Sequence, residues 1–141
     1  MTHPLRLLLS VSISTPMVSG ACGSNAPACL YNPGGFTLVK HTSAASGDGQ
    51  IGSVGSRLPL PLRAQVSVSG CLQSGVMVSW TTSDSGGIIR PASAFTDGNG
   101  IVVAAWTLGA RPGTQTVTVD IASPEYRTGA APDTFRATAN K

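Results

Sequence analysis

Three glycines, Gly47, Gly49 and Gly52, stand at the spacing G-x-G-x-x-G that holds a dinucleotide pyrophosphate in many enzymes. That chemistry needs a buried strand before the glycines and a helix directly after them, because the helix N-terminus binds the phosphates. Here Pro59 and Pro61 follow at alternate positions, and neither fits the interior of a helix. The sequence therefore predicts a glycine-rich turn between short strands and no nucleotide site.

Side chains that could perform catalysis are scarce. The two histidines, His3 and His41, belong to no hydrolase signature, and the motif G-x-S-x-G is absent. The six acidic residues fall in predicted turns or on polar strand faces, where carboxylates are solvated or form turns: Asp48, Asp84, Asp97, Asp120, Glu125 and Asp133. We therefore expect no catalytic residue, no cofactor and no enzymatic activity.

Two of these carboxylates are candidates for a metal site. Asp48 in Gly-Asp-Gly and Asp97 in Asp-Gly-Asn-Gly lie in oxygen-rich loops of the kind that ligate calcium at a domain edge. The full D-x-D-x-D-G spacing is missing, so turn formation is the first interpretation and calcium binding stays open. Because no C-x-x-C motif occurs and both histidines stand far from the cysteines, we expect no zinc site.

Charge and composition argue against nucleic acid as a partner. The net charge is +3, but the nine basic residues are scattered from Arg6 to Lys141 without a cluster, and Trp80 and Trp106 are not interleaved with arginine. Charged residues make up only 11% of the chain and aromatic residues 5%, whereas glycine and proline are abundant. This composition is typical of short β-strands joined by tight turns.

The first 21 residues have the layout of a secretory signal, with a cationic start at Arg6 and an apolar run over 7–14. The run is too short and too rich in serine to span a membrane. Residues 19–25 resemble the processing site of bacterial lipoproteins, in which Cys22 would be lipidated, although Ser19 departs from the usual pattern. Ala-Pro-Ala at 26–28 is a competing cleavage site, so export is predicted, with lipidation and simple cleavage both open.

The three cysteines give a parity argument. If Cys22 takes the lipid, Cys29 and Cys71 remain as a pair in an oxidising compartment. A bridge between them would join the N-terminal segment to the domain and, in the chain-entropy view, stabilise it by about 3–4 kcal/mol. Local pairing of Cys22 with Cys29, and no pairing at all, stay open.

Five stretches alternate apolar and polar residues with a period of two: 62–68, 76–81, 102–106, 117–121 and 135–139. Such alternation places one strand face on a core and the other in water. Turn signals at 97–100 and 111–113 separate neighbouring stretches. We expect an all-β, two-sheet antiparallel sandwich of about seven to nine short strands, with Trp80, Trp106 and Phe135 as core anchors and no helix longer than a turn.

Several short motifs follow one another in a set order, with Ser-Gly-Asp-Gly-Gln at 46–50, Thr-Asp-Gly-Asn-Gly at 96–100 and Trp-Thr-Leu-Gly at 106–109. Together with Phe-Arg-Ala-Thr-Ala at 135–139, their order resembles bacterial Ig-like domains related to the repeats of invasin and intimin. At 69–74 the chain departs from such repeats, which usually carry an Asp-Gly-Asn-Pro-type hairpin there.

The resemblance implies an Ig-like sandwich over 36–141, after a signal peptide over 1–21 and a linker over 22–35. Members of the group often stand in tandem in large surface proteins as spacers or adhesive stalks. We therefore expect a non-catalytic exported module, structural or adhesive, at the bacterial surface, as an outer-membrane lipoprotein or an extracellular protein. Its partner would be a surface protein or glycan, or further Ig-like domains, and membrane contact would come only from an N-terminal lipid.

Two other functions stay open. The module could bind a small ligand, either a glycan or calcium, through the loops that carry Asp48 and Asp97. It could also be a subunit of a surface filament, joined by strand exchange or by intermolecular pairing of Cys71.

Overall fold

The computed structural model describes residues 35–41, 45–83, 87–126 and 130–141. The strands in these ranges are β1 (Phe36–Lys40), β2 (Gln50–Ser53), β3 (Leu62–Val68), β4 (Cys71–Leu72), β5 (Met77–Thr82), β6 (Ile88–Arg90), β7 (Ser93–Phe95), β8 (Ile101–Thr107), β9 (Gly113–Ile121) and β10 (Asp133–Asn140). The helical structure of the described residues is one 3-10 turn, Pro124–Tyr126, so none of them forms a helix able to cross a membrane. The predictions for 1–21, Cys22 and Cys29 lie outside these ranges.

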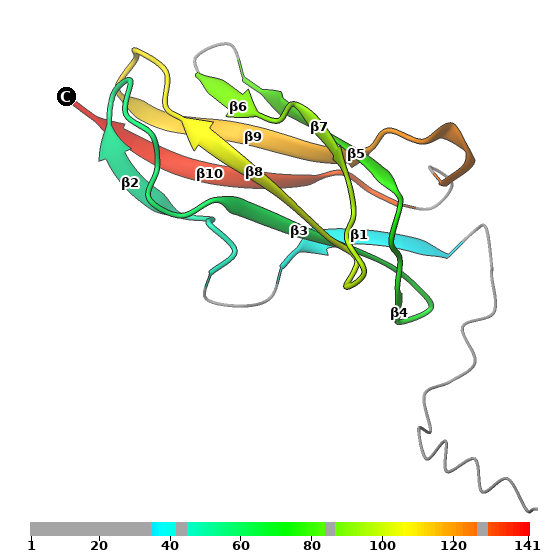
Figure 1. Cartoon of the computed structure of the whole chain (residues 1–141). Coiled ribbons are helices and arrows are strands. Elements are labelled where there is room, and N and C mark those ends of the chain that lie inside the picture. Colours follow the sequence, from blue (N-terminus) through cyan, green and yellow to red (C-terminus); the bar gives the residue numbers. More distant parts are fainter. Residues whose placement is uncertain (1–34, 42–44, 84–86, 127–129) are drawn as a thin grey trace, which may run out of the picture.

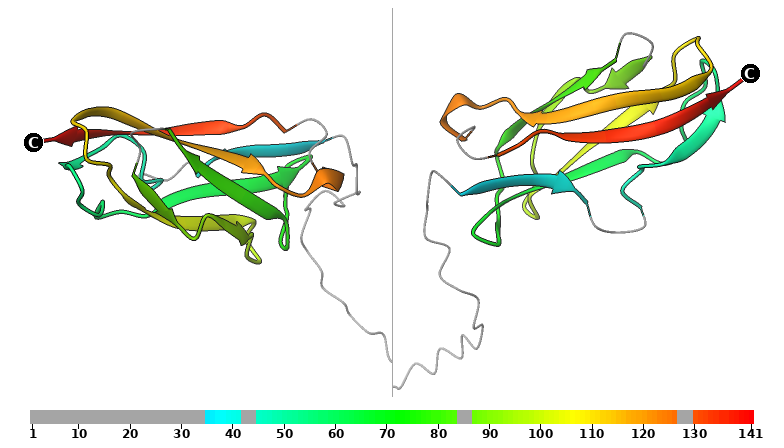
Figure 2. Two further views of the ribbon diagram at one scale, coloured as in Figure 1. Left: turned by 90° about the horizontal axis from the view of Figure 1, so that it is seen from above. Right: turned by 180° about the vertical axis from the view of Figure 1, so that it is seen from behind.

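The strands form two sheets that lie face to face (Figures 1 and 2). Sheet A has the order β1-β3-β8-β6, with β4 also paired to β3, and sheet B has the order β2-β10-β9-β5-β7. The start of β1 and the end of β10 lie at opposite ends of the sandwich, as the views in Figure 2 show. The predicted all-β, two-sheet sandwich is confirmed.

The strand count and one pairing differ from the sequence prediction. The described residues hold ten strands, more than the seven to nine expected from the sequence. Three of them, β4, β6 and β7, have only two or three residues each and are too short to show a period of two in the sequence. The chain also crosses between the sheets early. It leaves β1, which is antiparallel to β3, and joins the edge of sheet B as β2, which is parallel to β10.

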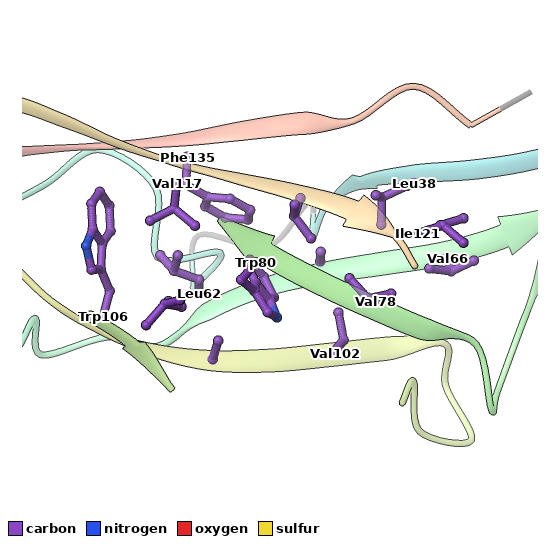
Figure 3. Packing of buried hydrophobic residues seen from close by; sticks show 14 of the residues in the cluster. Leu38, Leu62, Val66, Val78, Trp80, Val102, Trp106, Val117, Ile121 and Phe135 are labelled. Atoms are coloured by element: carbon purple, nitrogen blue, oxygen red, sulfur yellow. The ribbon is translucent and has the colours of Figure 1, made fainter. Parts of the chain in front are cut away.

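The core consists of the inward residues of the two sheets (Figure 3). The predicted anchors Trp80, Trp106 and Phe135 are all buried, and the rings of Trp80 and Phe135 lie 5.6 Å apart in a tilted arrangement. Tilted aromatic pairs at this distance add stabilisation beyond the burial of their area. These three side chains therefore hold the sheets together rather than contact a ligand.

The glycine motif begins in the turn before β2, at residues 47–49, and ends at Gly52 within β2; the described residues that follow form no helix there. Gly47 has a φ of 80°, and a Cβ there would overlap the backbone of Pro61. The side chain of Gln50 closes this loop, because its amide donates to the carbonyl oxygens of Gly47 and Leu60 and its Oε1 accepts from the Leu60 amide. The glycine spacing thus reflects a tight loop.

A matched pair of phenylalanines tests the core. Phe135 is 0% exposed, whereas Phe95 on edge strand β7 is 62% exposed. We expect Phe135→Ala to lower the free energy of unfolding by about 3–5 kcal/mol, because it leaves a cavity between the sheets. We expect Phe95→Ala to lower it by less than about 1 kcal/mol. Equal losses in urea denaturation would contradict this assignment of the core.

Candidate functional site

The residues that the structure describes enclose no pocket. Nor do they contain a group of three or more His, Cys, Asp or Glu side chains placed to hold a metal ion.

The first candidate metal ligand, Asp48, is engaged by the fold. Its Oδ2 accepts a hydrogen bond of 2.6 Å from Lys40 Nζ, and its Oδ1 accepts one of 2.8 Å from the Arg136 amide. Partial burial raises the pKa of the Asp48 carboxyl, but these hydrogen bonds and the Lys40 charge outweigh it and hold the pKa below its ordinary value of 3.8. Both oxygens thus have protein donors.

Lys40, at the end of β1, is the centre of a small polar cluster that joins the two sheets. Its Nζ lies 2.6 Å from Asp48 and 4.0 Å from Asp133, and 5.5 Å from the centre of the Phe135 ring. Its backbone amide also donates to Asp133 Oδ2 over 2.9 Å. Because Asp133 opens β10 in sheet B, the cluster fastens the edge of one sheet to the other.

The second candidate ligand, Asp97, shapes its own turn between β7 and β8. Its Oδ1 accepts hydrogen bonds from the amides of Asn99 and Ile101, over 2.8 and 2.9 Å. This is the usual use of aspartate in a turn. Asp48 and Asp97 share none of these hydrogen-bond partners. Among the described residues, neither belongs to a group of three or more acidic, histidine or cysteine side chains that could hold a metal ion.

The ion pair of Asp48 makes stability depend on pH. Because its folded pKa lies below 3.8, the carboxylate stabilises the fold above that pH, and the contribution is lost as pH falls through the folded pKa. We expect Asp48→Asn to lower the free energy of unfolding at pH 7 by about 0.5–1 kcal/mol, since the pair is partly exposed. Urea denaturation should show this deficit shrinking toward pH 3.

The control for that experiment is Glu125→Gln. Glu125 is exposed on the 3-10 turn. Its replacement should change stability by less than about 0.5 kcal/mol at either pH. A deficit for Asp48→Asn that stays constant from pH 7 to pH 3 would contradict the role assigned to its charge.

Of the three cysteines, Cys71 lies within the residues that the structure describes. Cys71, on β4, is buried and disulfide-bonded. Cys22 and Cys29 lie outside the described residues, so the pairing of Cys29 with Cys71 and the lipidation of Cys22 remain predictions. His41 follows β1, and its backbone amide donates to the Arg63 carbonyl oxygen.

Two buried polar side chains were missed by sequence reasoning. Gln115 is 1% exposed and holds the turn between β8 and β9, because it accepts from the Gly109 amide and donates to the Arg111 carbonyl oxygen. Thr96 is also buried, where its hydroxyl donates to Gln73 O and accepts from the Val76 amide. The alternation of β9 could have indicated that Gln115 is buried, because it stands two residues before Val117 and so lies on the same inward face.

The outer face of sheet B is rich in threonine. Thr81, Thr118 and Thr134 lie in one cross-strand row over β5, β9 and β10. The two edges of this sheet each carry an exposed apolar side chain, Ile51 on β2 at 66% and Phe95 on β7 at 62%. This sheet therefore has a polar face between two apolar edges.

The outer face of sheet A has a different character. Its strands turn their alternate residues outward, and Val39, Leu72, Val103 and Ile88 are exposed there. Three arginines, Arg57, Arg63 and Arg90, also project from it, since each lies opposite an outward residue of β8. The basic residues are scattered along the sequence, but strand pairing places these three arginines along β8 on one face.

No family model matches this chain, and no curated protein sequence does. Solved structures do. The adhesin InvE of Yersinia pseudotuberculosis has a TM-score of 0.52 and 16% identity, over 76% of this chain and 32% of that chain. The D00-D0 and D0-D1 domains of intimin have TM-scores of 0.43 and 0.45 and identities of 23% and 17%, each over 71% of this chain and 45% of that chain.

The chain therefore spans only about a third of the InvE structure that it matches. At this level of identity the match concerns the arrangement of strands. The resemblance to the Ig-like domains of the invasin and intimin group is confirmed, and it is confirmed at the level of the fold.

Proposed function

We propose that this protein is a non-catalytic, exported Ig-like module that acts as a structural or adhesive element at the bacterial cell surface. The observation that carries the proposal is the shared fold with the adhesin InvE. Ig-like sandwiches present loops at both ends and outer sheet faces that can meet a partner, while the body stays rigid.

The chemistry of the described residues supports a module of this kind. The carboxylates of Asp48 and Asp97, the candidates for ligand binding, accept hydrogen bonds within the fold. The described residues enclose no pocket in which a substrate could be shielded from water. An outer surface is what remains for binding, and no observation favours calcium at the Asp48 and Asp97 loops.

The disulfide of Cys71 supports export, because disulfides persist in oxidising compartments outside the cytosol. We extend the proposal to the N-terminal segment. Residues 1–21 are removed as a signal, Cys22 carries the lipid, and Cys29 is the partner of Cys71. The segment 22–35 then tethers the sandwich to the outer membrane.

Fractionation of a bacterium that expresses the full chain with a C-terminal tag tests this proposal. We expect the tag in the membrane fraction, open to protease added outside intact cells. Intact mass should show loss of 1–21, a gain of acyl chains and one disulfide. Cys22→Ser should release the protein from the membrane, because one anchor is then missing.

The matched control is Cys71→Ser, which removes a cysteine but leaves the proposed anchor in place. It should remain in the membrane fraction. Recovery of the wild-type chain unprocessed and fully reduced in the cytoplasm would contradict the proposed export.

A filament subunit is the second candidate, favoured by the exposed side chains of Ile51 and Phe95 on opposite edges of sheet B. Exposed sheet edges pair with other strands, although the short edge strands here limit that contact. Because Cys71 is already disulfide-bonded, strand exchange is the route that we propose for such a filament, and electron microscopy of the purified protein tests whether filaments form.

A further inference from the structure

The strongest unassigned feature is the arrangement of arginines around β8 on the outer face of sheet A. The outward residues of the last part of this strand are short: Val103, Ala105 and Thr107. Arg63 lies opposite Val103 from β3, and Arg90 lies opposite Ala105 from β6. A line of small side chains thus has long cationic side chains beside it.

The third arginine extends the same line. Arg57 forms an isolated antiparallel β-bridge with Thr107. Because Thr107 is paired with Ile88 of β6 on its other side, Arg57 lies on the side of β8 that faces β3. Successive outward residues on a strand are about 7 Å apart, and opposite residues on neighbouring strands about 5 Å apart. Along β8 the arginines therefore lie on alternate sides of the strand, Arg63 and Arg57 on the β3 side and Arg90 between them on the β6 side. We call Arg57, Arg63 and Arg90 the arginine track.

The charge of this face is of one sign. None of the outward residues on the strands of sheet A that the structure describes is acidic, and Asp48 and Asp133, the acidic side chains that pair with Lys40, lie outside those strands. The Nε of Arg63 is buried without a hydrogen-bond acceptor. The side chains of Arg57 and Arg90 are exposed, that of Arg63 is partly exposed, and the exposed Val103 lies beside Arg63.

We propose that the arginine track binds a linear acidic polysaccharide that runs along β8. The planar guanidinium group matches sulfate and carboxylate groups with two parallel hydrogen bonds, and its charge cannot be removed at neutral pH. Between the arginines, Val103 and Ala105 offer an aliphatic strip against which the C–H faces of sugar rings can lie. Short central side chains leave room for the polymer.

The same observations disfavour other anionic partners. The outward residues on the strands of sheet A include no aromatic side chain among those described, so single-stranded nucleic acid would find no base-stacking platform. An acidic peptide could not add as a strand to β8, because β8 is already paired on both sides. Tryptophan and tyrosine, which anchor proteins at membrane interfaces, are also absent from the described outward positions on the strands of this face.

This inference names a ligand for the proposed surface module and rests on the proposed function, because export is what would bring the protein into contact with such a polymer. Binding is measured on the purified full chain, so the two fail separately. Failure to bind would remove the ligand and leave the surface module, whereas the fractionation result alone decides export.

The test is a titration of the full chain with dextran sulfate, with uncharged dextran as the matched polymer. We expect binding of dextran sulfate alone, with log Kd rising against log salt at a slope of about 2–3, as expected when about three charges are neutralised. The variant Arg57→Gln/Arg63→Gln/Arg90→Gln should lose about 30-fold or more in affinity at low salt. Circular dichroism checks that the variants fold.

The control variant is Arg111→Gln/Arg136→Gln/Lys141→Gln, which removes the same charge from exposed positions elsewhere. Its affinity should stay within about threefold of the wild type. An equal loss in both variants would overturn the proposal, because net charge alone would then explain binding. Tighter binding to oligo-dT or to vesicles of phosphatidylglycerol than to dextran sulfate would overturn it as well.

Discussion

The packing of inward side chains at every second position of β3, β5, β8, β9 and β10 is the interaction on which the rest of the structure depends. On β3 and β9 these residues are almost fully removed from water. Burial of one such aliphatic side chain contributes about 1.5–3 kcal/mol. Because the period is two, a slip of one residue would turn the whole apolar set outward, so the core fixes the register of every pair.

That register also decides what the outer surface can do. It turns threonines outward on sheet B, and on sheet A it brings Arg63 and Arg90 beside the small residues of β8. Polar side chains near the sheet margins form hydrogen bonds and ion pairs that hold loops and strands together. Lys40 joins Asp48 and Asp133 across the two sheets, and Gln115 holds the turn before β9. These charged and amide side chains therefore take part in holding the fold together.

The alternation in the sequence predicted the long strands well. The stretches at 62–68 and 102–106 match β3 and β8, because a strand with one buried face shows its period directly. The same reasoning could not find β6 and β7, since three residues hold too little pattern. It also could not place β2 beside β10, because a parallel pairing between distant segments leaves no local mark.

The surface was harder to predict than the core. Arg57, Arg63 and Arg90 are spread along the chain, and only the pairing of β3 and β6 with β8 shows them to be neighbours. The roles of Asp48 and Asp97 were open for a similar reason. An aspartate next to glycine suits a turn and a metal loop alike, and the choice depends on whether backbone and lysine donors reach its oxygens.

Native-state hydrogen exchange measures whether the inward residues close the sandwich between its two sheets. We expect the slowest exchange for amides paired within β3, β8, β9 and β10, and much faster exchange for those of the short edge strands β6 and β7. Exchange in β9 and β10 as fast as in β7 would contradict a core closed between the two sheets.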